Sequence, residues 1–183
     1  MNIIESNLTA SEQREIEAWC AEVRATHAQL SQPIHEGESR YDQLLESRGY
    51  HISQFTPEEL GELYFAVVDG NLPQWPLAAP EWVVDTEVRS GAYPEITVEF
   101  HGKDWATFGG FMARIEQMHT VFVDDFTNSD GTIGEYHRHD MIPGEARIFI
   151  QKHNEDLAAD DALQLAIAIE DAATELNRYS SGN

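Results

Sequence analysis

Two histidines one residue apart stand in the stretch GTIGEYHRHDMIPGE, residues 131–145. In an extended strand His137 and His139 share a face and lie about 6.7 Å apart, a spacing at which both imidazoles can bind one metal ion. Glu135 is in phase with them. No third and fourth ligand follows in the local sequence, so histidines on a solvated strand or at a partner surface are the favoured interpretation. We therefore expect no cofactor and no metal, and keep a metal-binding protein or metal-dependent enzyme that uses His137 and His139 as the alternative.

The same stretch resembles the first motif of the cupin barrels, through Gly131, His137, His139 and Glu145. A cupin needs a second motif with a third histidine beyond a Pro-Gly turn, and that part of this chain has a helical pattern without one. Three further histidines belong to other elements, and no local pattern brings them to the pair: His101, His119 and His153. The resemblance therefore does not predict a cupin.

The stretch DDFTNSDG, residues 124–131, invites a comparison with a calcium-binding loop. When its last residues are aligned with the acidic positions and glycine of an EF-hand, Phe126 falls at the first ligand position and His137 at the closing glutamate. Neither side chain can serve, so a hairpin turn is the better interpretation.

Nucleophile and phosphate-binding motifs are missing from the sequence, which has no GxSxG, no P-loop and no dinucleotide-binding glycine pattern. Cys20, the single cysteine, lies in an apolar stripe beside Trp19, and we expect a buried core thiol there. The chain is therefore expected not to be an enzyme.

The strongest signal is the charge, because 33 acidic residues oppose 11 basic ones and give a net charge of −22. Phosphates would repel this surface, so direct binding to nucleic acid or to an anionic membrane is disfavoured. Between Arg48 and Arg89 the chain has no basic residue and seven acidic ones. Such a charge costs folding stability, which suggests that it is used or offset.

Acidic side chains on a rigid framework can occupy the positions of phosphates and bind the basic cleft of a nucleic-acid-handling protein or nuclease. The expected partner-binding residues are the acids of one helix and two adjacent strands, with one aromatic anchor: Glu58, Glu59, Glu62, Asp69, Asp85, Glu87, Glu95, Glu99 and Trp82. In character the chain resembles nuclease-immunity proteins and phage-encoded DNA mimics. It is interpreted as an acidic, non-catalytic interaction protein, most simply an inhibitor; the alternative is that the charge serves solvation alone.

The elements that position these residues are helical in the first half of the chain. Thr9 and Glu12 form a capping-box pattern, and a second one with Pro57 at its first helical position lies at Thr56 and Glu59. The first helix is expected to bury one stripe: Ile16, Trp19, Cys20, Val23, His27 and Leu30. A short helix is expected over 38–48, and the third helix is expected to end at Asp69-Gly70.

After the proline-rich connector 71–80 the periodicity becomes alternating. In the first strand Trp82 and Val84 are expected on one face, and in the second His101 is expected to point outward beside Glu99. The remaining expected elements are a helix over 104–118, strands over 119–126, 132–139 and 145–151 with turns at NSDG and IPG, and a helix over 158–178.

The sequence therefore predicts an α+β fold with N-terminal helices, then a mostly antiparallel sheet of about five strands and a long C-terminal helix packed on it. At 183 residues we expect a single domain, with a helical part over 1–70 and the sheet plus C-terminal helix over 81–183. One cysteine, no signal-peptide pattern and no long apolar run predict a cytoplasmic protein.

Overall fold

The computed structural model describes residues 8–35, 38–91, 93–106, 110–124, 131–132, 140–151 and 158–180. By its internal contacts the chain divides into two compact units, and each is described by itself. Unit 1 comprises Met1–Leu77, Val88–Thr97 and Thr120–Ile142, and unit 2 comprises Ala78–Glu87, Val98–His119 and Pro143–Asn183.

The described residues confirm the predicted α+β fold, with helices before a five-stranded, mostly antiparallel sheet and one helix after it. Its strands are β3 (Asp85–Ser90), β4 (Glu95–Ala106), β5 (Met112–Phe122), β6 (Asp140–Ile142) and β7 (Arg147–Gln151). The strand order is β3-β4-β5-β6, and β7 also pairs with β5. Val121 of β5 lies opposite Met141 of β6, and Ile115 of β5 lies opposite Ile148 of β7.

Unit 1 contains the first helix, α1 (Ala10–Leu30), which begins at the predicted capping box of Thr9 and Glu12. Its buried residues are the predicted stripe, which is therefore confirmed: Ile16, Trp19, Cys20, Val23, His27 and Leu30. The indole Nε1 of Trp19 donates a hydrogen bond of 3.0 Å to the carbonyl oxygen of Pro73, which fixes the connector after the third helix against α1.

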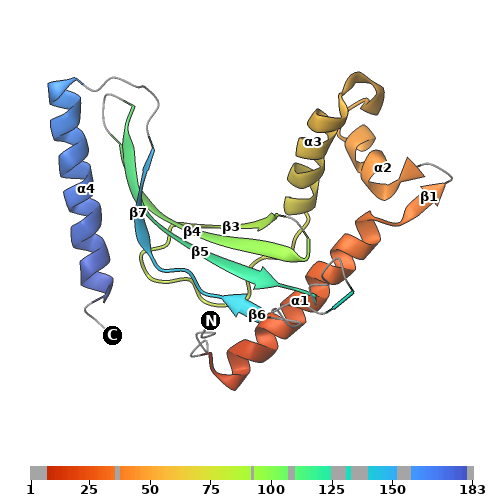
Figure 1. Ribbon diagram of the computed structural model, residues 1–183, viewed down its shortest axis with the longest axis horizontal. Helices are drawn as coiled ribbons and strands as arrows, with labels where there is room; N and C mark the ends of the chain where they lie inside the picture. Colours follow the sequence, from red (N-terminus) through yellow and green to blue (C-terminus); the bar gives the residue numbers. More distant parts are fainter. Residues whose placement is uncertain are drawn as a thin grey trace. The chain divides into compact units, whose positions relative to one another are not determined.

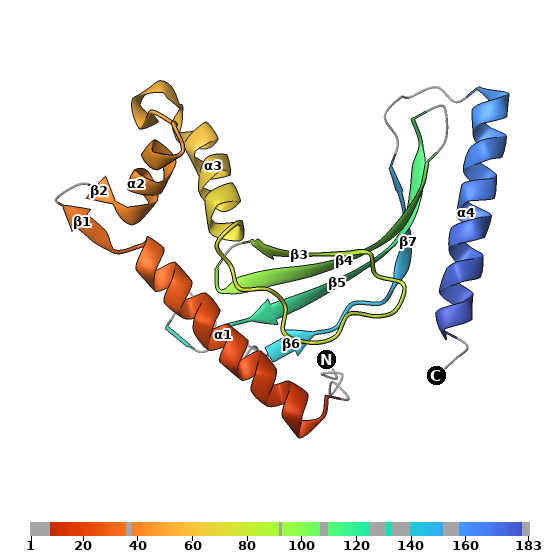
Figure 2. The same cartoon turned by 180° about the vertical axis from the view of Figure 1, so that it is seen from behind.

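The same unit holds a two-stranded ribbon of β1 (Pro33–His35) and β2 (Glu38–Ser39), the helices α2 (Arg40–Ser47) and α3 (Pro57–Asp69), and the short helix η1 (Ile52–Gln54) (Figure 2). The helix α2 is shorter than predicted, because Glu38 and Ser39 belong to β2. The hydroxyl of Tyr41 donates to the carbonyl oxygen of Leu60 at 2.6 Å and its ring lies 4.8 Å from that of Tyr64, so α2 packs against α3.

Unit 2 contains the last helix, α4 (Ala159–Ser180), which lies against β7 and buries Ala168 and Ala172 (Figure 1). A small residue is needed elsewhere in its core at Gly102, where an added Cβ would lie 3.2 Å from the indole of Trp82 and 3.2 Å from Ile115. Trp82 and Ile115 of β5 therefore both pack close to the backbone of Gly102 in β4.

The predicted helix over 104–118 is wrong, because this segment ends β4 and begins β5. Buried and partly exposed residues alternate from Phe111 to Ile115, the period of a strand that is covered on one face. Gly110 has a φ of +77°, a conformation typical of a tight turn. Gly110 therefore lies in a connection between two strands instead of inside a helix.

Three smaller predictions differ from the structure. The IPG segment is not a hairpin turn, because β6 before it and β7 after it both pair with β5. Val84 is 73% exposed, whereas Trp82 is buried, so the two residues do not share a covered face. The expected strand over 119–126 is in part the end of β5. The strand expected over 132–139 and the NSDG turn lie almost wholly outside the described residues.

Candidate functional site

The outer face of α3, in unit 1, presents two carboxylates and an aromatic ring in one line. Glu58, Glu62 and Phe65 follow one another at helical spacing, and all three are exposed, Phe65 by 44%. Among the residues that the structure describes, neither Glu58 nor Glu62 forms an ion pair with a cation. We call these three residues the α3 surface.

The neighbouring Glu59 has a structural role at the start of the same helix. Its Oε2 accepts hydrogen bonds from the backbone N–H of Thr56 at 2.8 Å and from the hydroxyl of Thr56 at 2.9 Å. These bonds lower the pKa of the Glu59 carboxyl below its ordinary value. The residue therefore keeps its negative charge beside the α3 surface while it caps the helix.

The other expected partner-binding residues have different positions. Asp69 accepts a hydrogen bond from the backbone N–H of Ser90, so this carboxylate joins α3 to the end of β3. Trp82 is only 6% exposed, and its indole belongs to the core of unit 2 instead of an interaction surface. Asp85 is exposed and Glu95 is half-buried. Glu87 and Glu99, also expected partner-binding residues, lie together in unit 2 around a histidine.

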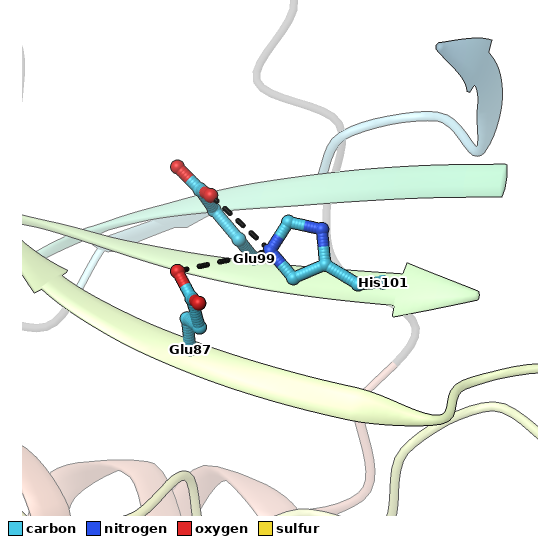
Figure 3. Close-up of side chains that lie close together, drawn as sticks. All are labelled: Glu87, Glu99 and His101. Atoms are coloured by element: carbon cyan, nitrogen blue, oxygen red, sulfur yellow. Dashed lines mark ion pairs between the residues drawn. The ribbon is translucent and has the colours of Figure 1, made fainter. Parts of the chain in front are cut away.

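This histidine is His101 of β4, whose imidazole lies among three carboxylates. Its Nε2 is 3.4 Å from a carboxylate oxygen of Glu99 and 3.9 Å from one of Glu87, and Figure 3 shows the ring turned toward both. Its Nδ1 is 3.6 Å from Oε1 of Glu116 on β5. The sequence predicts an outward-facing His101, but the residue is only 8% exposed, so that part of the prediction is wrong.

The carboxylate of Glu116 is itself fixed by an arginine. Oε1 of Glu116 accepts a hydrogen bond from Nε of Arg114 at 2.7 Å and forms an ion pair with Nη2 of the same guanidinium at 2.6 Å. The guanidinium also lies 5.4 Å from the ring of Phe149 on β7. Adjacent strands therefore place Arg114, Glu116 and the ring of His101 in one connected series of polar groups.

A second buried histidine, His27 of α1, meets a serine in unit 1. Its Nε2 lies 3.3 Å from the hydroxyl oxygen of Ser90, and its ring centroid lies 4.4 Å from that of Tyr93. Burial lowers the pKa of His27. His27 and Ser90 are 6% and 5% exposed, so a substrate cannot reach the hydroxyl, and the pair is a contact between α1 and β3.

A third histidine, the half-buried His119 of β5, contacts the segment between β6 and β7. The backbone N–H of Gly144 donates to its Nδ1 at 3.1 Å, so Nδ1 is an acceptor and carries no proton. The ring packs edge-on against Phe100 at 5.1 Å. Burial lowers the pKa of His119, and protonation of Nδ1 would also break the bond to Gly144.

We expect His27 and His119 to make the free energy of unfolding fall as the pH drops below about 6.5, above the range where most carboxyl groups titrate. His27 and His119 have pKa values below the ordinary 6.5 in the folded chain, so the unfolded chain takes up protons first. The stabilisation from these two neutral histidines is complete above about pH 6.5. It is lost as the pH falls toward their pKa values in the folded chain, by at most about 1.4 kcal/mol per pH unit for each group.

Urea unfolding at several pH values measures this slope. His119→Gln keeps an acceptor for Gly144 but removes the titrating group, and should flatten the slope. A slope that His119→Gln leaves unchanged would contradict the assignment.

Two candidates from the sequence remain, the histidine pair as metal ligands and the single cysteine as a core thiol. His137 and His139, with Glu135, fall outside the part of the chain that the structure describes. Cys20 has no exposed surface, and burial raises the pKa of its thiol to about 11, as a core thiol requires.

Comparisons with protein-family models, with curated protein sequences and with solved structures found no match for this chain. Across the described residues, none of the helices has the length and apolar character needed to cross a membrane.

Proposed function

We propose that this chain is an acidic, non-catalytic interaction protein, of the nuclease-immunity or DNA-mimic type, which binds the basic cleft of a nucleic-acid-handling protein. The observation that carries the proposal is the α3 surface, where Glu58 and Glu62 lie exposed beside Phe65 and form no ion pair with a described cation. A basic partner can supply the missing cations, and the ring can supply apolar contact area.

The charge distribution supports this assignment for unit 1. Its sequence segments hold 19 acidic and 6 basic residues, a net charge of −13, and unit 2 holds 14 and 5, a net charge of −9. A field of this sign accelerates the encounter with a basic cleft and repels nucleic acid from the same surface. A single, buried cysteine fits a reducing compartment, and we place the interaction in the cytoplasm.

The partner is to be captured from cell extract at low salt, eluted with rising salt, identified by mass spectrometry and purified. Its affinity for this chain should then fall steeply as salt increases, because the contact is electrostatic. Duplex DNA should compete for the same cleft. An affinity that salt does not change, or a complex that DNA does not displace, would contradict the proposal, and an extract that yields no partner would favour solvation as the role of the charge.

Substitutions locate the contact on α3. The double variant Glu58→Gln, Glu62→Gln should weaken binding about tenfold and reduce the dependence on salt, since two charged contacts are lost. Phe65→Ala should weaken it by a similar factor, because an exposed aromatic anchor is worth more than about 1 kcal/mol, but should leave the salt dependence unchanged.

The matched control is Glu170→Gln, Asp171→Asn on α4, where both side chains are exposed and belong to unit 2. It removes the same two charges and should change the affinity by less than about twofold. Equal effects of the two double variants would mean that the partner senses the net charge and does not contact α3.

A further inference from the structure

We propose that Glu87, Glu99 and His101 form a binding site for one divalent transition-metal ion, with Zn²⁺ as the best fit. The three residues come from adjacent strands of unit 2: Glu87 from β3, and Glu99 and His101 from β4. The site shares no residue with the α3 surface or with the pair His137 and His139.

The spacing of the ligand atoms suits a single ion. One oxygen of each glutamate and Nε2 of His101 all lie within 4.8 Å of one another. Around zinc, with ligands about 2.1 Å from the metal, tetrahedral neighbours are about 3.4 Å apart. Nε2 already lies 3.4 Å from Glu99 and 3.9 Å from Glu87, so small side-chain rotations close the site.

The second observation is the state of the histidine itself. His101 is only 8% exposed, and its buried Nδ1 has no hydrogen-bond partner among the described residues. In metal sites the ligating histidine commonly donates its other ring N–H to a carboxylate, which fixes the ring and makes it a stronger ligand. Glu116 stands at this position, 3.6 Å from Nδ1 and anchored by Arg114. When Nε2 of His101 binds a metal ion, Nδ1–H can donate a hydrogen bond to the carboxylate of Glu116.

The ligand types select the ion. An imidazole nitrogen with two carboxylate oxygens suits zinc and its first-row neighbours, whereas Mg²⁺ and Ca²⁺ prefer oxygen ligands alone. The side chains of Glu99 and Glu87 are 25% and 43% exposed, so the ion has a route from solvent and room for a water molecule as fourth ligand. A charged imidazole paired with the same carboxylates is the alternative that the experiment must exclude.

The test is calorimetric titration of the chelator-treated full chain with Zn²⁺ in about 0.5 M sodium chloride, where diffuse attraction of cations to an acidic surface is screened. We expect one ion per chain, and no displacement by a large excess of Mg²⁺. Glu99→Gln and His101→Asn should each weaken binding more than about tenfold, and Glu116→Gln by about ten- to a hundredfold, because it removes the group that orients the ring.

Two matched variants outside the cluster control for charge and for histidine content: Glu145→Gln in unit 2 and His51→Asn in unit 1, both at exposed positions. Each should retain the affinity of the parent chain. Thermal unfolding of every variant without metal identifies any that fail to fold, and Glu99→Gln, at a partly exposed position, tests the site if His101→Asn does fail.

Titration with Co²⁺ supplies a readout that diffuse binding cannot give, since direct ligation by nitrogen and oxygen produces visible absorption bands. The bands should appear with one equivalent and be absent from His101→Asn. Binding that vanishes at high salt, or that is equal in Glu99→Gln and Glu145→Gln, would overturn the proposal.

Discussion

Replacing Gly144 with alanine is expected to lower the free energy of unfolding by about 3 kcal/mol. A Cβ at this position would overlap the carbonyl oxygen of Met118 and lie 3.0 Å from its carbonyl carbon, and both are backbone atoms that no side-chain rotation can move. The shift would also disturb two hydrogen bonds of Gly144, one to Nδ1 of His119 and one from Nε2 of Gln117 to its carbonyl oxygen. Each is worth about 1 kcal/mol.

Urea denaturation measures this change, and Gly61→Ala is its matched control. Gly61 lies inside α3, where an added Cβ meets no atom within 4 Å. Alanine is the better helix former, so this variant should be more stable than the parent by about 0.5–1 kcal/mol. The same chemical change should therefore have opposite signs at the two sites. A Gly144→Ala variant as stable as the parent would show that β5 and the β6–β7 junction are not in close contact.

The helices α1 and α3 could be predicted from sequence because their signals are local. Thr9 with Glu12, and Thr56 with Glu59, satisfy free backbone groups within a single turn, and neither needs a distant partner. The structure of the segment 104–118 could not be predicted in this way. Its residues fit a helical pattern as well as the alternating pattern of a strand, and which of the two forms depends on pairing partners elsewhere in the chain. Residues 112–116 pair with β7, which lies about 35 residues further along the chain.

The candidate metal cluster depends on cross-strand register, which the sequence does not determine. Alternation along β4 places His101 on the same face as Glu99, and this much could be predicted. The contacts of its ring with Glu87 on one neighbouring strand and with Glu116 on the other could not be predicted, because they depend on how the strands are aligned. Without the register, the sequence offers only an outward histidine in an acidic chain. For the α3 surface, by contrast, helical spacing alone predicts that its residues share one face of the helix. Only the structure shows that Phe65 is exposed on this face.

The pair of Arg114 and Glu116 is expected to be worth more to the fold than any exposed ion pair of this chain, and Arg114→Met should cost about 2 kcal/mol. The methionine keeps an apolar stem over Phe149 but leaves the carboxylate of Glu116, 14% exposed, without its hydrogen bond and its ion pair, and facing the same histidine as Glu99. The expected loss is smaller than that for a fully buried pair, because the side chain of Arg114 is itself 25% exposed.

A double-mutant cycle separates this charge effect from packing. Arg114→Met combined with Glu116→Gln should recover most of the lost stability, because no unpaired carboxylate then remains. Arg147→Met is the matched control: Arg147 is exposed and lies opposite Glu116 in the β5–β7 register, and its loss should change stability by less than about 0.5 kcal/mol. If the single Arg114 variant were as stable as the double one, Arg114 would not hold Glu116. The carboxylate behind His101 would then lack the fixed position that makes it a suitable partner for the ring.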